Sequence, residues 1–261
     1  MTTRVAFVTG AAQGIGESIA LRLAEDGLDV AILDVRGKEE QMQDVVKRIE
    51  GFGRRAHWIV GDVSSETSVK DAVESVVQAL GCLDVMVANA GFALRDGRNI
   101  IESKLTPSTE DWDAIFAVHA RGTMLSYKYA ALQMIKQGGG GRLIGACSIA
   151  GKQGLIHLGA YSAAKFAIRG LTHVMSKELK EHNITVNAYA PGLIKTAMTA
   201  HPDDDKYGGP GSVIKNAIGL PSDTKLIEPS VIADLVSYLA RPEASFITGQ
   251  IVSVDGGLNY D

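Results

Sequence analysis

Cysteine is scarce in this sequence, which contains only Cys82 and Cys147 among its 261 residues. Two cysteines cannot form the disulfide framework of a small secreted domain, so we expect a protein from a reducing compartment. We interpret Cys147 as a small buried strand residue and assign it no redox function.

Long apolar runs are also missing, since none reaches the roughly 18 residues that a transmembrane helix needs. Residues 4–9 are strand-like from the start, which favours no signal peptide. With 26 Lys and Arg against 30 Asp and Glu, nothing indicates a surface for nucleic acid or a polybasic membrane anchor. The six histidines lack the spacing of metal ligands. We therefore expect a cytoplasmic protein that binds neither nucleic acid nor membrane and holds no metal.

Strand-like and helix-like segments alternate along the chain. The apolar segment VAFVTG ends at Gly10, and a second segment, LDVAILD, ends at Asp34. This alternation predicts one α/β domain over residues 1–261, a doubly wound parallel sheet with helices on both faces. The other elements that we expect are helices at 39–51, 65–80 (capped by Ser64 or Ser65), about 108–136, from about 160, and 230–240, and strands at 56–60, 83–91, 142–147, 184–190 and 250–254.

A glycine-rich turn, TGAAQGIG, joins the first strand to a helix. Glycines allow the backbone to approach a pyrophosphate, and the helix N-terminus offers free N–H groups. Asp34 stands close to where a carboxylate binds the ribose 2′-hydroxyl of NAD and repels the 2′-phosphate of NADP, although it could instead be a helix cap or turn residue. Arg36 weakens the preference for NAD, because an arginine can accommodate that phosphate.

A second set of polar residues is Ser148, Tyr161 and Lys165. Tyr161 and Lys165 share one face of a predicted helix, one turn apart, so the ammonium group should lower the pKa of the tyrosine. Such a tyrosine can exchange a proton with a substrate oxygen, and Ser148 could hold that oxygen. The alternative is an ordinary amphipathic helix preceded by a serine in a turn. Residues 193–229 lack clear periodicity, which is typical of a substrate loop or lid, or of a solvated excursion.

Five motifs follow one another along the chain: TGAAQGIG, ANAG, the set Ser148, Tyr161 and Lys165, PGLIKT and ITGQIVSVDGG. In this order they strongly resemble the short-chain dehydrogenases/reductases. The resemblance covers about residues 4–257. It implies a Rossmann-type sheet of about seven strands and NAD(P)-dependent hydride transfer between an alcohol and a carbonyl. It also implies a homotetramer, for which Trp112, Ile115 and Phe116, and the helix that starts near Ala160, could pair across subunits or belong to the core.

The same resemblance assigns roles to single residues. Ser148, Tyr161 and Lys165 would be catalytic, with Lys165 also bound to the nicotinamide ribose. The cofactor-binding residues that it implies are Gly10, Gln13, Gly14, Ile15, Gly16, Asp34, Asp62, Val63, Asn89, Ala90, Gly91, Tyr161, Lys165, Pro191, Gly192, Ile194 and Thr196.

Three places depart from the family pattern. Ala88 replaces the first asparagine of the usual NNAG. His119 stands where the family usually has an asparagine. The main-chain carbonyl of that asparagine holds a water molecule that links the active-site lysine to solvent in a proton relay. The imidazole of His119 could join this relay, or it could simply pack in the helix. The stretch after Gly91 looks longer than usual and carries Arg95, Asp96 and Arg98, which could shape substrate entry or decorate the loop.

The segments around the catalytic residues look most like those of diacetyl/acetoin reductases and 2,3-butanediol dehydrogenases. We therefore expect an NAD-dependent enzyme that acts on a small carbonyl or secondary alcohol. Substrate contacts would come from residues 93–106 and 193–226 and from Lys152, Gln153 and His157. A sugar/polyol dehydrogenase, a 3-oxoacyl reductase and a catalytically silent NAD(H)-binding scaffold or regulator are the alternatives.

Overall fold

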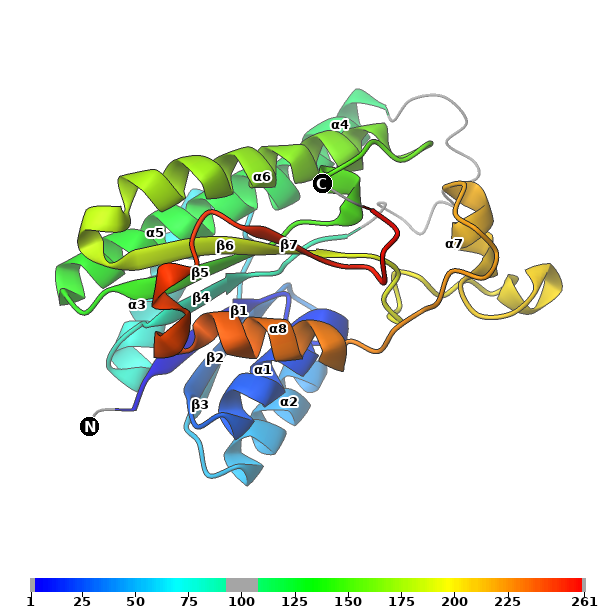
Figure 1. The fold of residues 1–261 in the computed structure, drawn as a ribbon. Coiled ribbons are helices and arrows are strands. Elements are labelled where there is room, and N and C mark those ends of the chain that lie inside the picture. Colours follow the sequence, from blue (N-terminus) through cyan, green and yellow to red (C-terminus); the bar gives the residue numbers. More distant parts are fainter. Residues whose placement is uncertain (1–2, 93–107, 260–261) are drawn as a thin grey trace.

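All strands of the sheet run in the same direction (Figure 1). The computed structural model describes residues 3–92 and 108–259, and within this part seven strands pair in the order β3-β2-β1-β4-β5-β6-β7. The predicted α/β fold class with one doubly wound parallel sheet is thereby confirmed. The strands are β1 (Val5–Thr9), β2 (Asp29–Asp34), β3 (Ala56–Val60), β4 (Val85–Ala88), β5 (Gly141–Ala146), β6 (Ile184–Pro191) and β7 (Ile251–Val254).

Helices cover both faces of the sheet because the central strands are apolar on both sides. Ala6 and Val8 of β1 pack toward α1, α2 and α8, whereas Val5 and Phe7 pack toward α3 and α5 (Figure 1). The helices are α1 (Gly14–Glu25), α2 (Glu39–Gly51), α3 (Glu66–Leu80), α4 (Thr109–Ile115), α5 (Gly122–Gln137), α6 (Gly159–Glu178), α7 (Ser212–Ala217) and α8 (Ser230–Ala240). No helix in the described part is long and apolar enough to cross a membrane.

Most predicted boundaries agree with the structure, and two segments differ. Ser65 caps α3 by accepting the N–H of Ser68 at 3.4 Å. The single long helix predicted at about 108–136 is instead α4, a π-helical turn at Phe116–Arg121, and α5. A π-turn holds one extra residue, and apolar periodicity along the sequence does not reveal it.

The segment 193–229 contains α7 and a short helical turn at Asp204–Tyr207, which its sequence did not predict. Its two ends are joined by an isolated bridge between Ile194 and Ile227. The buried carboxylate of Asp204 accepts three backbone N–H groups, from His201, Gly211 and Val213. These bonds lower the pKa of Asp204 against the effect of desolvation and keep the segment folded on itself.

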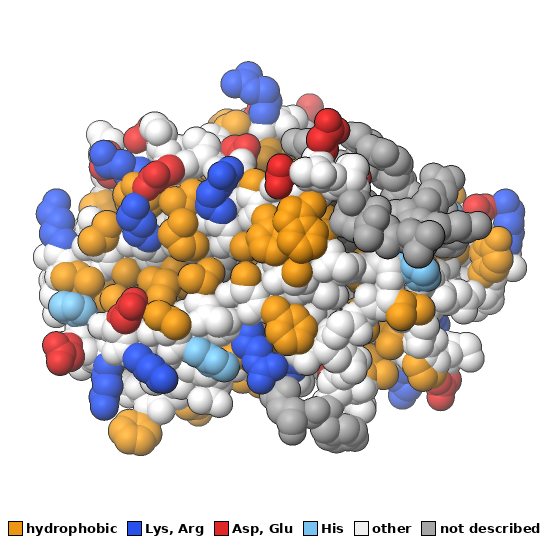
Figure 2. Space-filling view, turned by 90° about the horizontal axis from the view of Figure 1, so that it is seen from above, with side chains coloured by type: hydrophobic (Ala, Val, Ile, Leu, Met, Phe, Trp, Pro, Cys, Tyr) orange, Lys and Arg blue, Asp and Glu red, His pale blue; other side chains and the backbone are white. Residues whose placement is uncertain are grey.

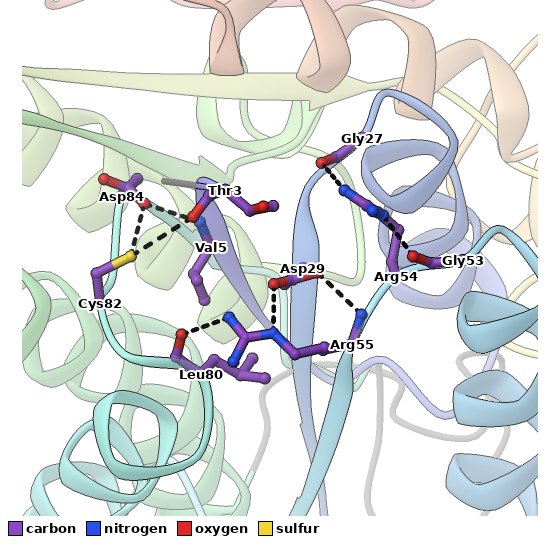
Figure 3. Close-up of polar contacts among 10 residues, drawn as sticks. All are labelled: Thr3, Val5, Gly27, Asp29, Gly53, Arg54, Arg55, Leu80, Cys82 and Asp84. Carbon is purple, nitrogen blue, oxygen red and sulfur yellow. Dashed lines mark hydrogen bonds and ion pairs between the residues drawn. The ribbon is translucent and has the colours of Figure 1, made fainter. Parts of the chain in front are cut away.

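The amino ends of the strands carry a separate polar cluster (Figure 3). Arg55 pairs with the buried carboxylate of Asp29 at 2.8 Å and donates to the carbonyl of Leu80. Asp84 accepts the N–H of Val5 at 2.7 Å and the thiol of Cys82 at 3.3 Å. Burial, and then Asp84, raise the pKa of Cys82 to about 11, so the thiol stays protonated at neutral pH. These contacts connect strand ends and loops far from the cavity described next.

Candidate active site

A cavity of about 510 Å³ opens at the carboxyl ends of the strands. This is the edge where open parallel sheets bind ligands. All the predicted catalytic and cofactor residues line it except Gly16, and Leu33, Val35, Lys38, Gly61, Phe92, Val118, Ala146, Cys147, Tyr189, Ala197, Met198 and Thr199 also contribute to its wall.

The glycine-rich turn packs too closely for side chains. Gly10 and Gly14 have positive φ angles of 66° and 62°. A Cβ on Gly10 would lie 2.7 Å from the Cα of Ala90, and a Cβ on Gly16 would lie 2.2 Å from the carbonyl oxygen of Gly10. Gly16 thus acts beneath the cavity, where it lets α1 approach the turn. Because Gln13 makes no side-chain cap, the first N–H groups of α1 are not capped by that residue and can serve an anionic group.

Asn89 connects three strands at the floor of the cavity. Its amide Nδ2 donates to the carbonyls of Thr9 and Gly10, both at 3.0 Å. Its Oδ1 accepts the hydroxyl proton of Tyr189 at 2.8 Å, and its N–H donates to the hydroxyl of Thr9. Thr9 and Tyr189 were not among the predicted site residues, because nothing in their sequence neighbourhood shows that both reach Asn89.

Removing the Tyr189 hydroxyl should loosen this floor. In Tyr189→Phe the Oδ1 of the half-buried Asn89 loses its donor, which should lower the free energy of unfolding by about 1 kcal/mol. Asn89 then holds Gly10 less firmly, so we expect NADH to bind about tenfold more weakly, a loss of about 1.4 kcal/mol. Urea unfolding and calorimetric titration measure both effects. Tyr238→Phe, on the exposed side of α8, is the matched control, and equal behaviour of the two variants would contradict the prediction.

The end of the cavity beside Asp34 carries charges of both signs. The carboxylate of Asp34 accepts the N–H groups of Ala12 at 2.9 Å and Val35 at 2.8 Å. Lys38 also lines this end and donates to Gln13 at 3.0 Å. Arg36, which the sequence suggested as the cation nearest a 2′-phosphate, is exposed and does not line the cavity. The cation here is therefore Lys38, which sequence analysis missed.

Ser148, Tyr161 and Lys165 meet at the end of β5, as predicted. Lys165 donates to the carbonyl of Ala146 at 2.6 Å, and its Nζ lies 5.3 Å from the centre of the Tyr161 ring. Ser148 accepts the N–H of Ala150 at 3.1 Å, and its hydroxyl bonds to that of Tyr161, which acts to lower the tyrosine pKa. The lysine and the tyrosine share one face of α6 next to the serine.

The expected lowering of the Tyr161 pKa by Lys165 is absent from the structure. Burial dominates and raises the pKa of Tyr161 to about 12, against the smaller effect of Ser148. Burial likewise lowers the pKa of Lys165 to about 8. The sequence shows that the two side chains are neighbours but not that Lys165 is buried and Tyr161 half-buried, and desolvation disfavours the charged form of each.

The lowered pKa of Lys165 predicts a rise in stability with pH. The unfolded lysine keeps its proton to about pH 10.5 and the folded one only to about pH 8, so the unfolded state binds more protons between these values. The protein without cofactor should gain up to about 3 kcal/mol over this window. The gain should be clearest below pH 10, because Tyr161 reverses the trend above the pKa of an unfolded tyrosine. Urea midpoints of wild type and Lys165→Met measure it, and an equal rise in both would contradict it.

His119 is 1% exposed and also lines the cavity. Burial, and then the charge of Lys165, lower its pKa well below the usual value. The imidazole is therefore neutral at physiological pH, which argues against the predicted possibility of a relay that titrates there.

The structure brings part of the predicted substrate region to the cavity. Ala197, Met198 and Thr199 of the segment 193–226 line the wall. Lys152, Gln153 and His157 are not among the described residues that line it, and His157 has a positive φ of 62° in an exposed turn. Residues 93–106, with Arg95, Asp96 and Arg98, lie outside the described residues.

Comparisons with known proteins agree with this geometry. A family model described as enoyl-(acyl carrier protein) reductase matches residues 10–259. The chain is 47% identical over 259 residues to a short-chain dehydrogenase/reductase of Armillaria gallica, covering 99% of this chain and 97% of that protein. It is 38% identical over 263 residues to an L-2,3-butanediol dehydrogenase of Corynebacterium glutamicum, covering 99% of this chain and 100% of that protein. A solved acetoin dehydrogenase from Salmonella typhimurium matches with a TM-score of 0.81 and 36% identity, covering 98% of this chain and 95% of that one.

Proposed function

Because this chain belongs to the short-chain dehydrogenase/reductase family and is an oxidoreductase, we propose that it uses NAD(H) to interconvert a secondary alcohol and a ketone. The favoured substrate is a small carbonyl compound such as diacetyl or acetoin. The observation that carries the proposal is the meeting of Ser148, Tyr161 and Lys165 in one cavity with the glycine-rich turn. The similarity to a butanediol dehydrogenase and an acetoin dehydrogenase supports the substrate class.

The residues of the cavity fit a nicotinamide dinucleotide. The turn leaves no room for a side chain at Gly10, holds Gly14 at a positive φ, and borders the first N–H groups of α1, which suits a pyrophosphate. Asp34 would hold the adenosine ribose, with Asp62 and Val63 beside the adenine. Pro191, Gly192, Ile194 and Thr196 line the other end and would hold the nicotinamide. When bound, the nicotinamide exchanges a hydride with the substrate carbon.

The catalytic residues would position and protonate the substrate oxygen. At neutral pH Tyr161 carries its proton, because burial raises its pKa to about 12, so it can act as the acid during reduction. Ser148 would donate a hydrogen bond to the same oxygen and hold it near Tyr161. Because the pKa of Lys165 is about 8, its ammonium group is mostly protonated at neutral pH. In this charged form Lys165 would also bind the nicotinamide ribose.

The test is oxidation of NADH and NADPH with a panel of carbonyl compounds near neutral pH. The panel contains diacetyl, acetoin, a ketose, an acetoacetyl thioester and an aryl ketone. We expect NADH to exceed NADPH and the vicinal carbonyl compounds to react fastest. Faster turnover with NADPH would reject Asp34 as the cofactor selector and point to Lys38. Fastest turnover of the ketose or of the thioester would indicate a sugar/polyol dehydrogenase or a 3-oxoacyl reductase instead. NADH binding without turnover of any compound would favour the catalytically silent scaffold.

We further propose that the chain assembles into a homotetramer through the face formed by α4, α5 and α6. Hydrophobic side chains spread over this face (Figure 2). Ile115, which the sequence offered either as a contact between subunits or as a core residue, packs in the core against Ala160 and Ala164. The exposed large apolar side chains on these helices are Trp112, Leu132, Ile135, Phe166 and Val174.

A charge on this face should weaken the assembly. Phe166 is 42% exposed on α6, and in Phe166→Glu a carboxylate would have to be desolvated at the contact. We expect a smaller particle by size-exclusion chromatography with light scattering, while thermal unfolding of the subunit changes little. Phe246→Glu, fully exposed beyond α8, is the control. A wild-type monomer would refute the tetramer, and an intact Phe166→Glu tetramer would refute this face.

A further inference from the structure

The His119 ring fills a slot between the catalytic tyrosine and the turn after β4. It meets the Tyr161 ring edge-on, with ring centres 5.2 Å apart, and packs against the Phe92 ring at 5.6 Å. A Cβ on Gly91 would lie only 2.4 Å from the Cε1 of His119. Gly91, Phe92, His119 and Tyr161 all line the cavity, so the imidazole sets the spacing between two parts of its wall.

Hydrogen bonding defines which ring nitrogen carries the proton. The Nε2 of His119 lies 2.7 Å from the carbonyl oxygen of Phe92, and the N–H of Phe92 lies 3.2 Å from the same nitrogen. The carbonyl only accepts and the N–H only donates, so the two contacts require opposite forms of Nε2; because the contact to the carbonyl is the shorter one, we assign the hydrogen to Nε2 and the lone pair to Nδ1. Nδ1 is buried and has no hydrogen-bond partner among the described residues. The ring thus has one strong polar contact, and it is to the backbone of Phe92.

We propose that His119 is a positioning residue that, as a neutral imidazole, fixes the Phe92 backbone against Tyr161 and so sets the substrate-binding wall beside the catalytic hydroxyl. This inference rests on the proposed function and concerns the same site. The groups that face the ring are Phe92 on one side and Tyr161 and Lys165 of α6 on the other. The ring acts through the position of the wall, which its contacts with Phe92 and Tyr161 hold.

Two substitutions separate the hydrogen bond from the packing. His119→Gln places an amide where Nε2 stands and can still donate to the Phe92 carbonyl, but it lacks the ring. His119→Phe keeps a ring against Tyr161 and leaves the Phe92 backbone without its partner. We expect His119→Phe to lower kcat/KM for the carbonyl substrate by about 10–100-fold, since small displacements near reacting groups have effects of this size. His119→Gln should recover at least fivefold of this loss.

The kinetic constants distinguish positioning from a general loss of structure. We expect a higher KM for the carbonyl substrate and a lower kcat in His119→Phe, while the Kd of NADH stays within twofold of wild type. Equal losses in the two variants, or wild-type kinetics in His119→Phe, would overturn the proposal. A loss of NADH binding as large as the loss in kcat/KM would also overturn it, because weaker cofactor binding would then account for the kinetic effect without a change in the wall.

A measurement without turnover keeps the proposal testable if a variant fails to fold or if no carbonyl substrate is found. Nitrogen NMR of wild type labelled in its histidines should show the His119 ring as the neutral Nε2–H form throughout pH 5–8, the range in which free histidines titrate. The His119 resonance is the one that disappears from the spectrum of His119→Gln. If His119→Gln does not fold, the resonance is identified instead as the one whose chemical shift changes in Lys165→Met. Protonation of His119 in this range, or the Nδ1–H form, would overturn the proposal. Absence of turnover with an intact Nε2–H form would reject the proposed function alone.

Discussion

Replacing Tyr161 by phenylalanine should lower kcat about 10³-fold, within the range of general acid–base catalysis. The change removes the hydroxyl that we propose delivers the proton, and it leaves the ring in contact with His119 and near Lys165. NADH should therefore still bind, with a Kd within about threefold of wild type. Stopped-flow reduction of the best carbonyl substrate, together with a fluorescence titration of NADH, measures both quantities.

The control for this experiment is Tyr207→Phe, at an exposed tyrosine in the segment 193–229. It removes a hydroxyl of the same kind that does not line the cavity. We expect this variant to retain wild-type kcat. Unchanged turnover in Tyr161→Phe would show that another group donates the proton, and Ser148 would be the next hydroxyl to test.

Replacing Gly16 by alanine should remove cofactor binding and destabilise the fold together. The new methyl group would lie 2.2 Å from the Gly10 carbonyl oxygen and 2.5 Å from the Nδ2 of Asn89, at a place where α1 and the turn are held by backbone contacts. We expect the free energy of unfolding to fall by about 3 kcal/mol or more. A comparable loss of binding energy weakens NADH affinity about 100-fold or more.

Gly51, the last residue of α2, provides a matched glycine. A Cβ there meets nothing within 4 Å, and its backbone does not have a positive φ. Gly51→Ala should therefore be neutral or stabilise the protein by up to about 1 kcal/mol. Thermal unfolding and NADH titration of both variants form the comparison, and a Gly16→Ala protein with wild-type affinity would show that the turn relaxes without consequence.

Local sequence patterns were sufficient to predict the order of strands and helices and most of the cavity wall. Gly10, Asp34 and the set at Ser148–Lys165 follow strands, and the carboxyl ends of parallel strands meet at one edge, so their convergence could be foreseen. Spacing therefore indicated that these residues share the cavity, and the other predicted wall residues came from the family resemblance.

The parts that the sequence did not reveal depend on burial and on contacts across strands. Desolvation of Tyr161 opposes the effect that its spacing from Lys165 implies. The hydrogen bond between Tyr189 and Asn89 joins positions 100 residues apart, and Lys38 reaches the cavity instead of Arg36 through the turn that precedes α2. The π-turn before Gly122 likewise depends on its surroundings, which apolar periodicity does not contain.

The strand order has a consequence for how the protein can be made. In the order β3-β2-β1-β4-β5-β6-β7, each strand joins an edge that already exists when it leaves the ribosome, so no strand has to be inserted between two others. Growth proceeds first on one side of β1, to β3, and then reverses to the other side with β4. The glycine-rich turn after β1 and Asn89 after β4 meet where this reversal occurs. A nascent chain can therefore bring the glycine-rich turn and Asn89 together before Ser148 and Tyr161 are synthesised, whereas the bond from Tyr189 of β6 to Asn89 is added later.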